Sequence, residues 1–274
     1  MILLQIIFLK YLEFFLYGLI QGLTEFIPVS STAHLKVISL FLGLNDPGIS
    51  VSAIIQLGSV FAIIWFFRRE ILNGDNLYFK NNVNSFFKKK FFISIFIGTI
   101  PILLLGGFVK FFIQNFFNSV LRSNFSIGII SILMAIFMYF ADISKSKFKN
   151  IENHNFVDSL LIGLAQAFAI VPGVSRSGIT ISTALLSGWE RRDAAKFSFL
   201  LGIPAITIAA IIEFFFTLGQ LDKISLFPLV VGLITSFFSS LFALDFFLRY
   251  ISSNGIKIFV YYRFFLSILI LLNL

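Results

Sequence analysis

Two long apolar stretches of this chain are each interrupted near the middle by a polar cluster that contains a proline. The first stretch covers residues 11 to 44 and the second residues 157 to 188, and their breaks read Ile27-Pro28-Val29-Ser30-Ser31-Thr32 and Val171-Pro172-Gly173-Val174-Ser175-Arg176-Ser177. Non-helical backbone is tolerated at membrane depth only where protein buries it or where it lines a wet cavity. We therefore expect two re-entrant hairpins, each made of a helix, a break and a second helix.

The remaining sequence indicates that lipid is the solvent of this chain. Hydrophobic residues make up 58% of the 274 residues and charged residues only 12%, more apolar surface than a soluble domain of this size can bury. Six further runs are long enough to cross a bilayer, which takes about 20 residues. These runs cover residues 50 to 67, 91 to 113, 124 to 141, 195 to 217, 225 to 248 and 256 to 273. The prediction is an all-α polytopic membrane protein with one domain, residues 1 to 274.

The distribution of Lys and Arg predicts the orientation of these spans. Loops at 68 to 90, 145 to 149, 191 to 196 and 249 to 257 hold 14 of the 21 Lys and Arg residues, which assigns their side to the cytoplasm. The net charge of +8 is therefore a topology signal, and we expect no nucleic-acid partner. In this orientation the first hairpin enters from the outer face and the second from the cytoplasmic face, so their breaks meet near the midplane.

This arrangement is an inverted-topology repeat with halves of about 1 to 141 and 157 to 274. Gly18-Leu19-Ile20-Gln21 is echoed by Gly163-Leu164-Ala165-Gln166, and in both copies a serine follows the glutamine by nine residues. A second echo relates Gly98-Thr99-Ile100-Pro101 to Gly202-Ile203-Pro204.

The first hairpin carries an acidic residue at membrane depth. Gln21 and Glu25 are four residues apart, so both side chains lie on one helical face and point toward the break. An acidic residue at the membrane centre costs about 2.5–3.5 kcal/mol on insertion scales, so it normally faces a cavity and has a partner. The alternative is a buried Glu that is satisfied by a helix-packing hydrogen bond.

Hydroxyl groups and a histidine follow this carboxylate. Ser30, Ser31 and Thr32 precede a renewed helical pattern, where they either cap the helix or help its N-terminus to bind an anion. His34 lies one turn further on, and we interpret it as a candidate general acid or base, with a structural buried histidine as the alternative. His154, by contrast, is expected to lie in a charged loop.

The second hairpin supplies a cation. Arg176 must be paired at this depth, and its planar fork suits a phosphate or a carboxylate. The structural alternative is an ion pair with Glu25. Ser175, Ser177 and Thr180 surround the start of the next helix, where hydroxyls and free N–H groups form a cradle for an anion.

Other intramembrane polar residues are assigned structural roles. We expect Asp245 to pair with Arg249 one turn later, Glu213 to lie near the outer interface, and Gln56 to form a hydrogen bond between helices.

The two hairpins together suit phosphoryl transfer. A divalent cation held by Glu25 would neutralise phosphate charge, Arg176 would stabilise the transition state, and His34 would move the proton. The strongest rival is a transporter or flippase for an anionic lipid headgroup, which needs the arginine but neither a proton carrier nor an attacking oxygen. A channel or purely structural role leaves the polar clusters unexplained.

At these residues the sequence resembles the undecaprenyl-diphosphate phosphatase family, the bacitracin-resistance type. The family's Glu/Gln-x-x-x-Glu motif is matched by Gln21 and Glu25, and its Pro-Gly-x-Ser-Arg-Ser motif by residues 172 to 177. Its Pro-x-Ser-Ser-Thr-x-His motif is matched by residues 28 to 34, and the segment 196 to 204 also looks like the family.

The resemblance implies an enzyme of the bacterial cytoplasmic membrane that converts undecaprenyl diphosphate to undecaprenyl phosphate and phosphate for peptidoglycan synthesis, with bacitracin competing for the substrate. It implies Mg²⁺ or Ca²⁺ held by Glu25 and Gln21, and makes Glu25, His34 and Arg176 essential. Ser31 is the expected nucleophile, with Ser175 and a metal-bound water as alternatives, and a homodimer is left open. Gln21 leaves one carboxylate fewer for metal, and Ala33 stands where the family often has glycine, so we expect weaker metal binding.

Overall fold

A computed structural model describes residues 2–44, 46–72, 85–144, 148–217 and 223–272, and all its regular elements over these ranges are helical. In chain order they are α1 (Ile2–Glu25), α2 (Ser31–Leu42), α3 (Gly48–Phe66), α4 (Arg68–Leu72), α5 (Ser85–Phe112), α6 (Gln114–Phe116), the π-helix η1 (Phe117–Leu121), α7 (Asn124–Ile143), α8 (Phe156–Ala167), the 3₁₀ turn η2 (Phe168–Ile170), α9 (Arg176–Leu186), α10 (Arg191–Thr217), α11 (Lys223–Asn254) and α12 (Lys257–Leu271). The all-α prediction is confirmed.

Five helices in the described part of the chain are long and apolar enough to cross a membrane, which confirms a multi-pass membrane protein. They cover Gly48–Phe66, Lys90–Phe112, Asn124–Ile143, Arg191–Phe216 and Leu226–Asn254, close to five of the six predicted spans. The sixth, residues 256 to 273, was predicted too long. α11 continues to Asn254 and the chain turns at Gly255 with φ of 72°, so α12 has only 15 residues and a length of about 22 Å.

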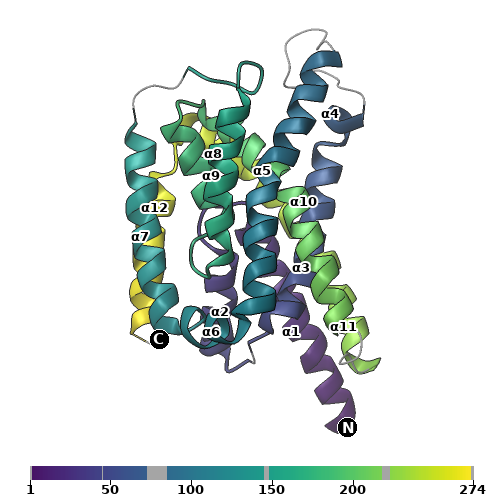
Figure 1. The fold of residues 1–274 in the computed structure, drawn as a ribbon. Helices are drawn as coiled ribbons and strands as arrows, with labels where there is room; N and C mark the ends of the chain where they lie inside the picture. The colour runs from purple at the N-terminus through teal and green to yellow at the C-terminus, as the bar shows by residue number, and fades with distance from the viewer. Residues whose placement is uncertain (1, 45, 73–84, 145–147, 218–222, 273–274) are drawn as a thin grey trace.

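Both predicted hairpins are present, and they enter from opposite ends of the molecule (Figure 1). α1 rises from the end that holds both termini and α2 returns to it, whereas α8 and α9 descend from the opposite end and return there. The first arm of the first hairpin begins at Ile2 and not near residue 11, because the apolar N-terminal residues continue the helix. The second hairpin matches its predicted limits closely.

Helix packing places the two breaks against each other. α1 packs on α11 and α8 packs on α5, while α3 lies against α10 and α7 against α12. Beneath the breaks, Phe26 is fully buried and its ring meets that of Phe199 edge-on at 5.1 Å. The first hairpin is therefore anchored on α10, which also supports the second hairpin.

Glycines allow two of these helix pairs to approach closely. A Cβ atom on Gly18 would lie 2.1 Å from the carbonyl oxygen of Gly232, and one on Gly163 would lie 2.4 Å from that of Gly98. Gly98 on α5 thus contacts α8 in the same way as Gly232 on α11 contacts α1, and the second sequence echo, which matched Gly98 with Gly202, stays a prediction. The division into halves 1 to 141 and 157 to 274 stays a prediction.

His154 lies in the loop between α7 and α8, as expected, but the expectation that this loop keeps it out of an apolar environment was wrong. Its ring is buried beside the rings of Trp189 and Phe197, with Nε2 at 2.8 Å from the Ser94 hydroxyl and Nδ1 at 2.5 Å from the Ile151 carbonyl oxygen. Burial lowers the pKa of His154 below its ordinary value of 6.5. Sequence neighbours such as Glu152 suggested exposure, but the loop folds back onto α5 and α10. His154 therefore anchors the loop between the hairpin and α7.

Close packing at Gly163 predicts a stability effect. Gly→Ala in a helix interior ordinarily stabilises by up to about 1 kcal/mol. At Gly163 the new methyl would meet backbone, so Gly163→Ala should lower the free energy of unfolding by about 1–3 kcal/mol. Gly107→Ala is the control, because nothing lies within 4 Å of its Cβ position. Thermal unfolding in detergent measures both, and equal midpoints would contradict the close contact between α8 and α5.

Candidate functional site

Each hairpin break ends in a serine with an unusual backbone conformation. Ser30 has φ of 74° and Ser175 has φ of 68°, and they are the only non-glycine residues with positive φ in the described ranges. They directly precede α2 and α9, so in each hairpin the strained residue sets the direction in which the second helix starts. The Ser175 hydroxyl caps the Gly178 amide at 3.2 Å, whereas Ser30 forms no side-chain cap.

Glu25 at the end of α1 is the centre of the polar contacts. Its Oε2 accepts hydrogen bonds from Gln21 Nε2 at 2.6 Å and from Ser31 Oγ at 3.1 Å. Its Oε1 accepts from Gln56 Nε2 at 2.8 Å and from Arg176 Nη2 at 3.1 Å. Four helices therefore contribute donors to one carboxylate whose side chain is only 3% exposed. The expected hydrogen bond of Gln56 between helices is confirmed, and its acceptor is Glu25.

Arg176 at the start of α9 connects the second hairpin to this carboxylate. Its Nη1 donates to the Ser198 carbonyl oxygen at 3.1 Å, while its buried Nε has no hydrogen-bond partner among the described residues. Gly202 makes room for the guanidinium, since a Cβ atom there would lie 1.9 Å from Nη1. A buried donor without a partner costs about 1–3 kcal/mol. Arg176 thus retains a donor that a ligand oxygen can use.

The predicted hydroxyl groups separate into two sets. Ser31 and Ser175 are half-buried at the breaks, as is Thr32 in the first turn of α2. Ser177 and Thr180 are fully buried: Ser177 donates to the Ile27 carbonyl oxygen across the two breaks, and Thr180 bonds the Arg176 carbonyl oxygen and Ser198 Oγ. Ser177 and Thr180 therefore stabilise the packing around the breaks and do not form part of the exposed surface of the site.

The structure places His34 beside the site without a direct hydrogen bond to Glu25, Ser31 or Arg176. Its Nδ1 lies 2.8 Å from the Ser30 carbonyl oxygen, which can only accept, so Nδ1 carries the proton. Its Nε2 then accepts from the Tyr262 hydroxyl at 2.7 Å. Tyr262 also stacks on the imidazole with ring centroids 5.5 Å apart.

The sequence reasoning missed several residues around the breaks. Tyr262 and Arg263 lie in α12, and Ser198 and Gly202 lie in α10. The signal for Arg263 was available, because an arginine inside an apolar span normally has a partner or a function. Ser198 and Gly202 carried no comparable signal, since small residues are common wherever helices pack.

The oxygen donors near Glu25 suit a hard divalent cation. No group of three or more His, Cys, Asp or Glu side chains that could hold a metal occurs in the described part of the chain. Mg²⁺, however, often uses one or two carboxylates together with substrate phosphates and water. Glu25 and the Ser31 hydroxyl therefore suit a metal that arrives with its substrate, whereas Gln21 and Gln56 present their Nε2 groups to the carboxylate and would have to rotate to offer an oxygen.

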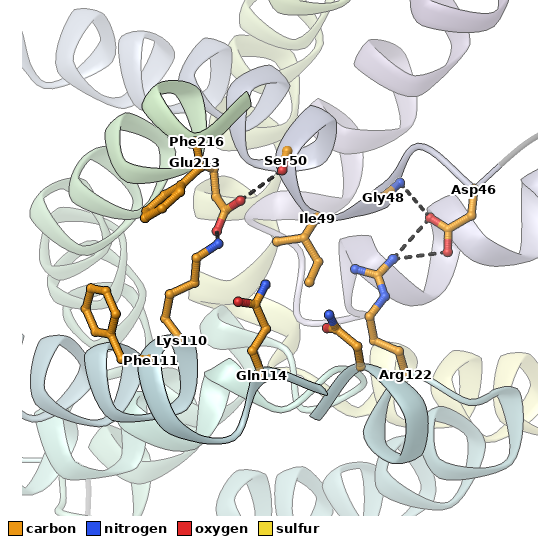
Figure 2. A pocket seen from close by; sticks show the side chains of 11 residues that line it. Asp46, Gly48, Ile49, Ser50, Lys110, Phe111, Gln114, Arg122, Glu213 and Phe216 are labelled. Atoms are coloured by element: carbon orange, nitrogen blue, oxygen red, sulfur yellow. Dashed lines mark hydrogen bonds and ion pairs between the residues drawn. The ribbon is translucent and has the colours of Figure 1, made fainter. Parts of the chain in front are cut away.

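A separate pocket opens at the end that holds the termini, with a volume of about 740 Å³ (Figure 2). Figure 2 shows the Lys110 ammonium reaching Glu213, whose carboxylate also accepts from Ser50, and Arg122 reaching Asp46. Glu213 thus lies near the predicted outer face, as expected. The Asp245–Arg249 pair is confirmed at 2.8 Å, and both side chains are exposed on α11. No residue of the predicted site lines the pocket.

Comparisons with known proteins match this chain to one family over nearly its whole length. The family model described as bacitracin resistance protein BacA matches residues 14–269. The undecaprenyl-diphosphatases of Prochlorococcus marinus strains MIT 9215 and MIT 9515 are 63% and 61% identical over 266 residues, covering 97% of this chain and all of each relative. The undecaprenyl-diphosphatase of strain NATL1A is 46% identical over 274 residues and 98% of each chain. The match includes both hairpins.

The close fit of Gly202 against Arg176 predicts an effect on turnover. Gly202→Ala should displace the guanidinium and lower the rate of phosphate release by about a hundredfold, because a shift of 1 Å at a reacting group has that effect. Gly106→Ala is the matched control, since its Cβ would meet only Ile170 Cδ1 at 3.7 Å. An unchanged rate in folded Gly202→Ala would show that the position of Arg176 is not critical.

Proposed function

Because the chain belongs to the bacitracin resistance protein BacA family, we propose that it hydrolyses undecaprenyl diphosphate to undecaprenyl phosphate and inorganic phosphate. The observation that carries this proposal is the contact between Glu25 and Arg176, which joins the two breaks and is surrounded by hydroxyl groups. A lipid-linked diphosphate needs such a site, because its charged headgroup must react at the edge of an apolar phase.

Binding of the diphosphate would use the donors that the site leaves available. The free Nε of Arg176 and its Nη2 lie on one edge of the guanidinium, which suits two phosphate oxygens. The first turns of α2 and α9 add the positive ends of two helix dipoles. A phosphate that takes Nη2 from Glu25 would leave Gln56 as the donor to that carboxylate oxygen.

The contacts favour Ser31 over Ser175 as the nucleophile. The Ser31 hydroxyl already donates to Glu25 Oε2, so the carboxylate can accept its proton during attack. The Ser175 hydroxyl instead caps Gly178 and faces Ser177 Oγ at 3.3 Å, without a base. Attack of Ser31 Oγ on the terminal phosphorus breaks the bond to the bridging oxygen and releases undecaprenyl phosphate. Water then hydrolyses the phosphoserine to inorganic phosphate. Direct attack by water would use the same base.

His34 has a less direct role in this scheme than the sequence suggested. The leaving group is a phosphate monoester, whose second pKa is about 6, so it departs at neutral pH without a proton. The Nδ1–H of His34 holds the Ser30 carbonyl oxygen and thereby the strained residue ahead of Ser31. We propose that His34 mainly orients the first break, and that any proton it moves passes through the Tyr262 hydroxyl.

A divalent cation, Mg²⁺ or Ca²⁺, would be held by Glu25 with help from Gln21 or Gln56, and would neutralise charge on the phosphate oxygens. With a single carboxylate, this site should bind the cation weakly in the absence of substrate.

We further place the enzyme in the bacterial cytoplasmic membrane, where undecaprenyl phosphate serves peptidoglycan synthesis and bacitracin would compete for the diphosphate. A homodimer and the lack of a nucleic-acid partner stay predictions.

Phosphate release from a long-chain polyprenyl diphosphate by purified protein in detergent tests the proposal. We expect release that a chelator abolishes, that falls at least a hundredfold in Glu25→Gln, Arg176→Ala and Ser31→Ala, and that falls less in His34→Ala. Asp245→Asn, which removes an exposed ion pair, should behave as wild type. If folded wild-type protein releases no phosphate but moves the lipid between leaflets of a vesicle, the rival transporter is correct.

A further inference from the structure

Arg263 in the middle of α12 is a fully buried cation that contacts both hairpin breaks. Its Nη1 donates to the Pro28 carbonyl oxygen in the first break at 3.4 Å, and its Nη2 donates to the Gly173 carbonyl oxygen in the second break at 2.5 Å. Nη2 and Nε also reach the hydroxyl and the carbonyl oxygen of Ser131 on α7, at 3.1 and 3.5 Å. One side chain therefore joins three separate segments.

These contacts explain why a guanidinium stands at this position. The backbone carbonyls of a break have no helical partner, and at membrane depth each unsatisfied group costs several kcal/mol. The planar fork of arginine has five donors and reaches carbonyls that point from different directions, which no neutral side chain can do. All these acceptors are neutral oxygens, so the charge is stabilised by dipoles and not by a carboxylate among them.

The contacts lie at matching places in the two hairpins. Pro28 is three residues before Ser31, and Gly173 is three residues before Arg176. By fixing both carbonyls, the guanidinium sets how far the attacking hydroxyl of one hairpin lies from the phosphate-binding arginine of the other. The Glu25–Arg176 contact at 3.1 Å depends on the same alignment.

We propose that Arg263 is a positioning residue for the reaction: it aligns the two breaks without touching the substrate. This inference rests on the proposed hydrolysis. Because Arg263 acts on the alignment of the breaks, loss of its side chain should lower kcat. KM should stay nearly unchanged, since the prenyl chain and Arg176 still bind the lipid. A lysine at this position keeps the charge but offers one nitrogen in place of a fork.

Steady-state phosphate release in detergent, with wild type, Arg263→Gln and Arg263→Lys, tests the proposal. We expect kcat to fall about a hundredfold in Arg263→Gln and about tenfold in Arg263→Lys, with KM within about twofold of wild type. Arg249→Gln is the matched control, because it removes an exposed arginine that pairs only locally with Asp245. An inactive wild type would refute the hydrolysis itself, whereas an active wild type with wild-type kcat in both variants would refute only the role of Arg263.

A distance measurement separates alignment from general folding. The chain has no cysteine, so spin labels at Phe41→Cys and Leu186→Cys report only the exposed ends of α2 and α9. In Arg263→Lys we expect a broader distribution of distances between these labels while the other helices stay folded. A distribution identical to wild type, or failure of both Arg263 variants to fold, would overturn the proposal.

Discussion

A carboxylate and a guanidinium that meet inside a membrane each lose hydration that lipid cannot replace, so each requires partners from the protein. Here Glu25 ends the first helix of one hairpin and Arg176 begins the second helix of the other, and they meet at 3.1 Å. Much of the architecture serves this contact. The hairpins enter from opposite ends, Gln56 and Gln21 supply further donors to the carboxylate, and Gly202 leaves room for the guanidinium.

The same constraint links the fold to the chemistry. Both oxygens of the Glu25 carboxylate accept hydrogen bonds, whereas Arg176 retains one free donor, its Nε. An anionic substrate requires such a free donor. A diphosphate that binds this donor competes with Glu25 for the guanidinium and thereby removes a cationic donor from the carboxylate that accepts the Ser31 hydroxyl. Binding and activation are then coupled through one ion pair.

The sequence was sufficient to predict both hairpins, most spans and the convergence of Glu25 and Arg176 at the two breaks, because proline-containing polar breaks inside apolar stretches have few physical solutions. Their ion pair was considered only as the structural alternative to a shared ligand. It was insufficient where the answer depends on packing between distant segments. Nothing local distinguishes Gln56, which binds Glu25, from a glutamine that joins two helices elsewhere. The burial of His154 likewise depends on Trp189 and Phe197, which are far along the chain.

The central claim is that residues from the two hairpins form one anion site. Titration calorimetry with a non-hydrolysable methylene analogue of a polyprenyl diphosphate measures this directly, without dependence on catalysis. We predict that Thr32→Val, which removes a half-buried hydroxyl from the first turn of α2, and Arg176→Ala in the second hairpin each weaken binding at least about tenfold, as expected for lost hydrogen bonds to a charged group. If only one of the two variants lost affinity, the hairpins would not share a single ligand, and the account would be wrong.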